Sequence, residues 1–166
     1  MRCLTGPEQE QWLSKNELLG KPYGTDKAPA NYIQFRAPIR LPQIQAFTHN
    51  LVDLFWPERE ALVAVEDWGL YEPYEMLIVD ALRGSHGEKR PLIEASGHCF
   101  DFTEKNELIA LFSLTTAFNW TAYLYFPASK VTLLNWEGAL FDFWSVRPGD
   151  LESISRVVGE FDLKKK

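Results

Sequence analysis

The spacing of apolar residues along the chain predicts four helices separated by extended stretches. Apolar side chains recur at intervals of three and four residues, as on one face of an amphipathic helix, over about residues 7–19, 42–56, 104–117 and 149–161. Short stretches rich in β-branched and aromatic residues predict strands at about 32–36 and 61–65. The third helix is apolar on more than one side, so we expect it to be the central and most buried of the four.

The stretch 118–145 holds the densest run of aromatic residues and is expected to organise the sheet. It contains nine Phe, Trp and Tyr residues and only three charged ones. Turn-forming sequences at 127–130 and 137–138 divide it into successive strands. We therefore expect an antiparallel ribbon at the centre of the sheet, with the flanking helices covering one face.

Capping residues mark two of the helix starts. Thr5 and Glu8 form a capping box, in which the threonine accepts a hydrogen bond from the first turn and the glutamate reaches back. Gly20 is expected to end this helix. Thr103 is the expected N-cap of the third helix, with Asp101 assisting it.

One segment, 75–83, fits two structures. Leu77, Ile78 and Ala81 would share one face of a helix. The Ile-Val pair at 78–79 and the turn that follows the segment favour a strand in a hairpin. The hairpin is the favoured interpretation, and the helix is the alternative.

Together these patterns predict an α+β fold in a single domain over residues 1–166. The sheet is expected to have about five to six antiparallel strands, with helices packed on it. The chain is long enough for one domain with a sizeable core, and no repeat or linker divides it. Residues 163–166, which include three lysines, are expected to be a solvated tail beyond the last helix.

The net charge, the length of the apolar runs and the number of cysteines exclude several classes of partner. The formal net charge of −6 argues against nucleic acid, because a protein that binds phosphates needs a basic surface. No apolar run is long enough for a secretory signal or a transmembrane helix, so no membrane partner is expected. Two cysteines, Cys3 and Cys99, are too few for a disulfide framework and indicate a reducing, cytoplasmic compartment.

The negative charge is concentrated in one segment. Residues 58–80 include seven acidic residues and one arginine, whereas the remaining 16 acidic and 16 basic residues balance. Aromatic residues are interleaved with these acids, which suits a basic protein partner, because complementary charge speeds association and buried aromatic residues hold a complex. The alternative is a solvated loop that only keeps the protein soluble. The candidate partner-binding residues are Glu66, Asp67, Trp68, Tyr71, Glu72, Tyr74 and Glu75.

A second candidate site lies in the aromatic stretch. Carboxylates beside aromatic rings suit a cleft that binds a sugar or another small molecule, and two carboxylates at a set separation could hydrolyse a glycoside. The alternative is that these acids only serve turns and strand ends. The candidate cleft residues are Trp136, Glu137, Asp142 and Trp144.

No catalytic residue, metal site or cofactor is expected from the other motifs. His98 and Cys99 are neighbours on a predicted strand and so face opposite sides, which favours a buried structural cysteine over an activated thiol. The three histidines lack the spacing of a metal-ligand pair. Arg83, Lys89 and Arg90 surround a turn that could hold an anion, although hairpin loops are often basic in this way.

The segment 91–126, PLIEASGHCFDFTEKNELIALFSLTTAFNWTAYLYF, resembles a group of small acidic bacterial proteins. The shared features are a Gly-His-aromatic turn, an apolar helix with an acidic cap, and a Trp followed by a Tyr-Leu strand. Such proteins are similar in size and acidity to the immunity proteins of bacterial toxin systems. The resemblance covers roughly a quarter of the chain and carries over no catalytic residue.

This resemblance implies a non-enzymatic inhibitor whose partner is a basic, toxin-like protein such as a nuclease. We therefore expect a protein-interaction module. The small-molecule or carbohydrate-binding cleft is the alternative, and homo-oligomerisation through exposed aromatic residues stays open.

Overall fold

The computed structural model describes residues 1–56, 60–69 and 72–165, which form seven strands and five helices. The predicted α+β class is confirmed, and all four predicted helices form, although the first ends at Lys15 and not at Gly20. In chain order the elements are β1 (Arg2–Leu4), α1 (Gly6–Lys15), β2 (Asn31–Arg36), α2 (Leu41–Phe55), β3 (Ala61–Asp67), α3 (Pro73–Ser85), β4 (Gly97–Phe100), α4 (Lys105–Ala117), β5 (Thr121–Phe126), β6 (Val131–Trp136), β7 (Leu140–Ser145) and α5 (Pro148–Glu160).

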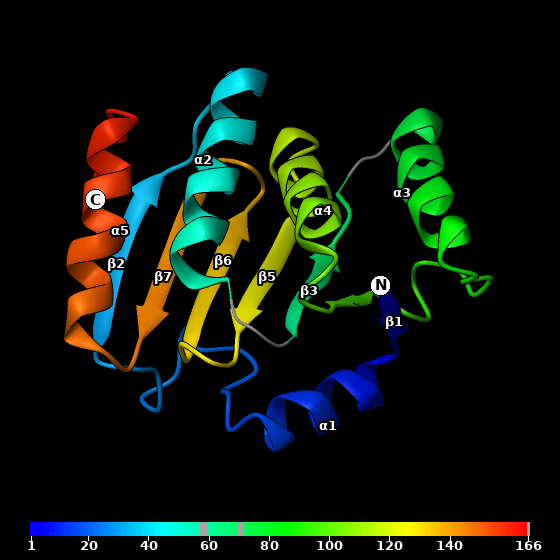
Figure 1. Cartoon of the computed structure of the whole chain (residues 1–166), viewed down its shortest axis with the longest axis horizontal. Helices are drawn as coiled ribbons and strands as arrows, with labels where there is room; N and C mark the ends of the chain where they lie inside the picture. The colour runs from blue at the N-terminus through cyan, green and yellow to red at the C-terminus, as the bar shows by residue number, and fades with distance from the viewer. Residues whose placement is uncertain (57–59, 70–71, 166) are drawn as a thin grey trace.

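All seven strands belong to one antiparallel sheet in the order β1-β4-β3-β5-β6-β7-β2. The ribbon predicted over 118–145 forms as β5, β6 and β7, which are neighbours joined by short turns (Figure 1). The sheet has more strands than predicted because β1 and β4 have only three and four residues. Strands this short give no readable alternation of polar and apolar residues.

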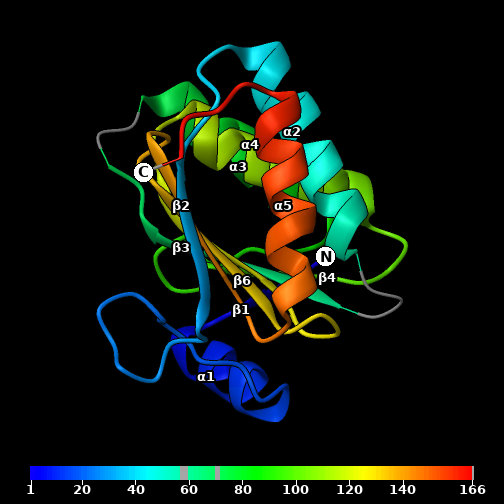
Figure 2. The ribbon, with the colours of Figure 1, turned by 90° about the vertical axis from the view of Figure 1, so that its left-hand side faces the viewer.

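The sheet is covered on both faces. Helices α2, α4 and α5 pack on one face, where the larger hydrophobic core lies (Figure 1). Helix α1 and the segment that follows it cover part of the other face, where a smaller aromatic core lies (Figure 2). The central strands are therefore buried on both faces. No helix in the described ranges is both long and apolar enough to cross a bilayer.

The helix caps agree with the sequence in one case and differ in the other. The capping box of Thr5 and Glu8 is present. The predicted cap at Thr103 is wrong, because α4 begins at Lys105 with Glu104 at the N-cap position. Thr103 instead donates from its backbone N–H and its hydroxyl to the Asp101 carboxylate, at 2.8 and 2.6 Å. A short polar side chain that bonds to its neighbours in this way competes with capping.

The favoured hairpin over 75–83 is also wrong, because the chain forms helix α3 there. Pro73 stands in the first turn of α3, where its fixed φ suits a helix and its missing N–H costs nothing. Glu72 and Glu75 form a capping box of the same kind as the one in α1. Val79 is fully buried, so the segment packs as a helix on the same core as the sheet.

Helix α3 lies beyond the sheet edge and is fastened there by a buried arginine (Figure 1). Arg83 is only 2% exposed. Its guanidinium donates to the Ala95 carbonyl and to the Arg90 carbonyl, both at 2.7 Å, and lies 3.2 Å from His98 Nε2. This fork of donors joins α3 to the loop before β4 and to β4 itself. Arg83 therefore holds the fold together and is not available to an anion.

The last residues of the chain lie along the edge strand β2. The Lys164 carbonyl accepts a hydrogen bond from the Arg36 N–H at 2.9 Å, and Lys165 forms an isolated antiparallel bridge with Phe35. The side chains of both lysines are exposed, whereas Leu163 packs against the larger core, and Lys166 lies outside the described residues. Backbone contacts of this kind cover part of an otherwise open sheet edge.

Replacing the buried arginine tests how α3 is held. Arg83→Met leaves buried backbone carbonyls without a donor, so we expect it to lower the free energy of unfolding by about 2–4 kcal/mol. Arg83→Lys keeps the charge without the fork and should cost less than Arg83→Met. Arg156→Met, a control at an exposed position of α5, should change stability by about 0.5 kcal/mol or less. Urea denaturation of all three variants measures this, and an equal loss in Arg83→Met and the control would contradict the assignment.

Acid pH should destabilise the protein through His98. Burial, and then the neighbouring Arg83 charge, lower the pKa of His98 to about 3. The unfolded chain binds a proton near the ordinary histidine pKa while the folded chain does not, so stability is present above pH 6.5 and is lost as the pH falls toward 3. We expect the loss from His98 to be about 3 kcal/mol between pH 6.5 and 4. The measurement is the free energy of unfolding of wild type and of His98→Gln as a function of pH. An equal loss in the two proteins as the pH falls would contradict this prediction.

Candidate functional site

The predicted acidic segment does not form a single surface, because β3 separates its ends. Glu60 precedes β3, accepts a hydrogen bond from Trp12 Nε1 at 2.8 Å and lies 3.6 Å from the Arg2 guanidinium. Glu66 lies near the end of β3 and pairs with the Lys21 ammonium. Both carboxylates are thus compensated by basic residues near the start of the chain.

Acidic residues that stay exposed gather where β3 stops and β5 starts. A crevice of about 500 Å³ lies between these strand ends and the turn that joins β6 to β7. Asp67, the last residue of β3, and Glu137, in the β6–β7 turn, both line it, and neither forms an ion pair within the described ranges. The lining residues are Asp67, Gly69, Phe118, Asn119, Thr121 and Glu137.

The turns that carry these residues are fixed by left-handed backbone conformations. Asn119, Glu137 and Gly138 have φ values of 58°, 47° and 63°. A side chain at Gly138 would meet a backbone carbonyl of α4 at 2.3 Å, so this position requires glycine. The buried Asn135 side chain accepts from the Gly138 N–H at 3.1 Å and thereby ties the turn to β6. Glu137 is therefore held on a rigid turn.

A row of aromatic rings lies beside the crevice. Trp68 meets the buried Trp120 edge to face with ring centroids 4.8 Å apart, and Phe118 lies 5.4 Å from Trp120. Tyr74, from α3, reaches Phe118 at 6.5 Å and is 59% exposed. The row runs from the interior to solvent, so it offers apolar contact area next to the acids.

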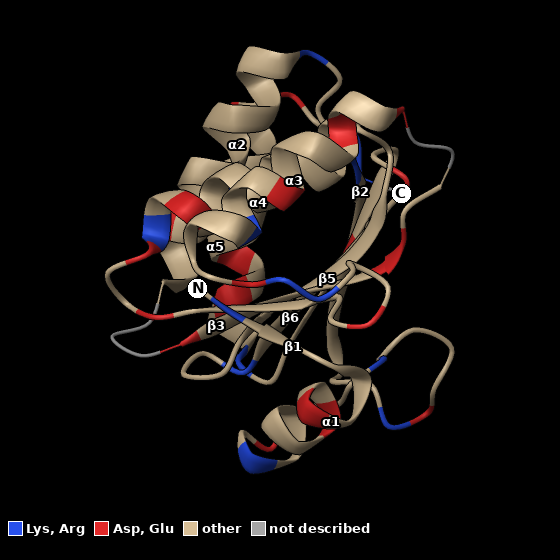
Figure 3. Cartoon of the chain, turned by 90° about the vertical axis from the view of Figure 1, so that its right-hand side faces the viewer, with Lys and Arg blue, Asp and Glu red and all other residues tan. Residues whose placement is uncertain are grey.

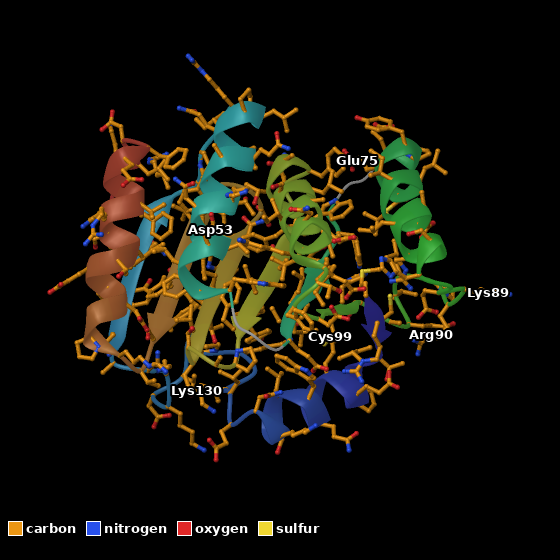
Figure 4. All side chains as sticks on the ribbon, viewed as in Figure 1. Asp53, Glu75, Lys89, Arg90, Cys99 and Lys130 are labelled. Carbon is orange, nitrogen blue, oxygen red and sulfur yellow. The ribbon has the colours of Figure 1, made fainter. Side chains whose placement is uncertain are left out.

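The start of α3 carries two acidic residues, of which one is exposed and the other is buried and hydrogen-bonded within the capping box. Glu72 serves as the N-cap of α3 and remains exposed. Glu75 accepts from the Glu72 N–H at 3.3 Å, is only 9% exposed, and lies on the α4 side of α3 (Figure 4). Tyr71, and the acidic Glu58, lie outside the described residues.

Among the cleft candidates, Asp142 is buried and its carboxylate is hydrogen-bonded by residues of the same protein. Its carboxylate is fully buried and accepts hydrogen bonds from Tyr32 Oη at 2.6 Å, from Gln34 Nε2 at 2.8 Å and from Trp136 Nε1. Burial, and then this bond to Asp142, raise the pKa of Tyr32. Trp144 is 3% exposed and packs against Tyr32. Asp142 thus joins β2, β6 and β7 on the smaller core.

The four cleft residues are therefore divided between two environments. Glu137 lines the crevice with Asp67, whereas Asp142 and Trp144 are interior. Trp136 is half-buried under Tyr23, with ring centroids 4.8 Å apart. The structure thus places Glu137 in one crevice with Asp67, a partner-binding candidate, and not in one cleft with the other three cleft candidates.

Other reactive groups are committed to the fold. Burial raises the pKa of the Cys99 thiol to about 11, and Cys99 faces the smaller core while His98 faces Arg83. At the predicted basic turn, hydrogen bonds from Arg90 lower the pKa of Glu88 to about 2, and Arg90 lies near the C-terminal end of α3 (Figure 4). Within the described ranges no group of three or more His, Cys, Asp or Glu residues could hold a metal ion.

Sequence reasoning missed that Phe118, Asn119 and Glu137 join Asp67. Asn119 and the Glu-Gly pair at 137–138 were visible as turn residues. Nothing local indicated that these turns would meet the end of β3, because that meeting depends on the strand order.

Neutralising the buried carboxylate separates its structural role from a binding role. Asp142→Asn places an amide donor among three donors, so we expect it to lower the free energy of unfolding by about 2–4 kcal/mol. The control Asp67→Asn, at an exposed position, should change stability by about 0.5 kcal/mol or less. Thermal and urea denaturation measure both. A stable Asp142→Asn protein would show that the carboxylate is not needed for packing.

We compared the chain with protein-family models, with curated proteins and with solved structures, and none of them matches it.

Proposed function

We propose that this protein is a non-enzymatic interaction module that binds a basic protein partner at the crevice between β3, β5 and the β6–β7 turn. The single observation that carries the proposal is the position of Asp67 and Glu137. They line one crevice, Asp67 from the last position of β3 and Glu137 from the rigid β6–β7 turn, and neither is in an ion pair within the described residues.

Charge supports this proposal over a purely solubilising role. Glu60 and Glu66 pair with basic residues of the same chain, whereas Asp67 and Glu137 form no ion pair with any residue that the structure describes. A concave site lined by one sign of charge focuses its field on an approaching partner of the opposite sign. A lysine or arginine side chain of a partner is the natural complement to such a crevice.

The aromatic row supplies the affinity that exposed charges lack. Exposed ion pairs contribute little because water and salt screen them. Aromatic residues that become fully buried contribute most of the energy in many interfaces. Tyr74 is exposed and Trp68 half-exposed, so both can lose surface to a partner that inserts its basic side chain into the crevice.

The partner class that fits best is a basic, toxin-like protein, in keeping with an immunity-type inhibitor. An inhibitor of this kind needs only a rigid, complementary surface, and the crevice stands at the end of a seven-stranded sheet. The sugar- or small-molecule-binding cleft has less support, since the carboxylate of Asp142 is occupied by three protein donors.

Charge reversal in the crevice tests the proposal. The double variant Asp67→Lys/Glu137→Lys should retain about tenfold less of the bound protein than wild type, because the crevice then repels a basic partner. The control Glu152→Lys/Glu160→Lys makes the same charge change on exposed positions of α5. Both proteins and wild type serve as baits in extracts of the source cells, and quantitative mass spectrometry identifies what each retains.

Salt provides the second arm of this experiment. Proteins retained by wild type and the control should be basic and should be released as salt rises, since charge attraction is screened. The proposal fails if the retained proteins are acidic or neutral, or if the crevice variant and the α5 control retain the same proteins equally.

A further inference from the structure

A cleft lies between helix α1 and the sheet, on the face opposite α2, α4 and α5. Its volume of about 460 Å³ is within the range of about 300–1,000 Å³ that is usual for small-molecule sites. Figure 3 shows α1 below the sheet, with acidic positions on its ribbon and both basic and acidic positions in the loop that follows it. This α1 cleft is lined by residues of α1, of that loop, of β3, of the loop before β4 and of β5.

Gln9 of α1 is held rigidly on the wall of this cleft. It is only 9% exposed, and its Nε2 donates to the Leu4 carbonyl at 3.3 Å and to Ser96 Oγ at 3.2 Å. A Cβ atom at Gly97 would lie 2.6 Å from the Gln9 side chain. Gly97 does not have a positive φ, so the close approach of Gln9 is what requires glycine there. The fold thus omits a side chain in β4 to admit an amide beside the cleft.

Two hydrogen-bonding atoms at this end of the cleft are left for another molecule. A carbonyl only accepts, so the contact with Leu4 identifies the near atom as Gln9 Nε2 and leaves Oε1 without a described donor. Ser96 Oγ accepts from Gln9, and its own proton has no acceptor among the described residues. This end of the cleft therefore offers an acceptor next to a donor.

The other end of the cleft carries charges of both signs. Leu13 lies one turn beyond Gln9 on α1, and a Cβ atom at Gly20 would be 3.3 Å from its side chain. Lys21 follows Gly20, and its ammonium pairs with the Glu66 carboxylate of β3. The Lys21 side chain is 66% exposed and that of Glu66 is 30% exposed. Such an ion pair contributes little to stability, so it can exchange partners at low cost.

Apolar groups form the floor between the two ends. Leu13, Ala64 and Tyr125 all line the cleft, and none is more than 9% exposed. Ala64 is the small residue of this floor, and Tyr125 donates from its hydroxyl to the Gly20 carbonyl. The floor and the loop above it are therefore fixed to one another, and the cleft between them is part of the fold.

This combination of groups determines the chemistry of a suitable ligand. An anion would meet the carboxylates of Glu10 and Glu66, and a simple cation would leave Lys21 without a partner. A purely apolar molecule would cover Gln9 Oε1 and Ser96 Oγ without bonding to them, which costs free energy. A small zwitterion with an amide at its far end satisfies both ends of the cleft.

We infer that the α1 cleft binds a free α-amino acid with a carboxamide side chain, of which glutamine is the type. Its α-ammonium bonds to Glu66 and its α-carboxylate to Lys21, in place of their bond to one another. Its carboxamide donates to Gln9 Oε1 and accepts from Ser96 Oγ. The four residues from Gln9 to Leu13 span about 6 Å along α1, a distance that a glutamine side chain covers together with a hydrogen bond.

A set of matched ligands tests this inference by isothermal titration calorimetry. We expect L-glutamine to bind and each of four analogues to bind at least about tenfold more weakly. L-Leucine has a similar shape without the amide, and L-glutamate has the same length but cannot donate to Gln9 Oε1. N-Acetylglutamine lacks the α-ammonium, and glutaminamide lacks the α-carboxylate.

Protein variants locate the binding. Glu66→Gln and Lys21→Met each remove a partner of the zwitterion and should weaken L-glutamine about tenfold. Ser96→Ala removes the donor to the carboxamide and should reduce the preference for glutamine over leucine. The controls Glu160→Gln and Lys15→Met make the same changes at exposed positions outside the cleft and should bind L-glutamine within about twofold of wild type.

Several outcomes would overturn the inference. They are no binding of L-glutamine at up to about 10 mM, equal binding of any of the four analogues, or cleft variants that bind like their controls while thermal denaturation shows them to be folded. Glutaminamide binding as tightly as glutamine would show that the α-carboxylate plays no part. None of the substituted residues lines the crevice of the proposed function, so the two tests succeed or fail independently.

Discussion

The burial of the central strands on both faces is the constraint on which the rest of this structure depends. Strands β5, β6 and β7 place apolar and aromatic side chains toward α2, α4 and α5 on one side and toward α1 and its following segment on the other. A strand interior of this kind has no room for an uncompensated charge, because a buried charge must be paired or hydrogen-bonded. Asp142 meets that requirement with three donors, and Arg83 with backbone carbonyls.

Acidic side chains that form no ion pair within the described ranges are consequently found at the periphery of the sheet. Asp67 and Glu137, which form no ion pair among the described residues, lie at strand ends: Asp67 closes β3, and Glu137 stands in the β6–β7 turn. In the helical layer, Asp53 of α2 is paired with Lys105 of α4. At the strand ends the protein thus presents an acidic crevice with aromatic residues beside it.

Helix α3 shows why local pattern was insufficient in one place. Its residues 77–79, Leu-Ile-Val, favour a strand by composition, and the turn after it looked like a hairpin turn. The capping box of Glu72 and Glu75 was also readable, and it agreed with the helix. Tertiary contacts decided between the two, because a helix lets Val79 and Arg83, four residues apart, enter the interior on one face.

The sequence by itself determined the α+β class, the four amphipathic helices, the aromatic ribbon and the first capping box, since each depends on residues within a few positions of one another. It also placed the excess of negative charge in one segment. Only the tertiary structure decided which of those acids stay uncompensated, because Arg2, Lys21 and Glu137 are remote in the chain from the acids they pair with or adjoin. Strand order brings such residues together, and strand order is set by long-range packing that no local pattern records.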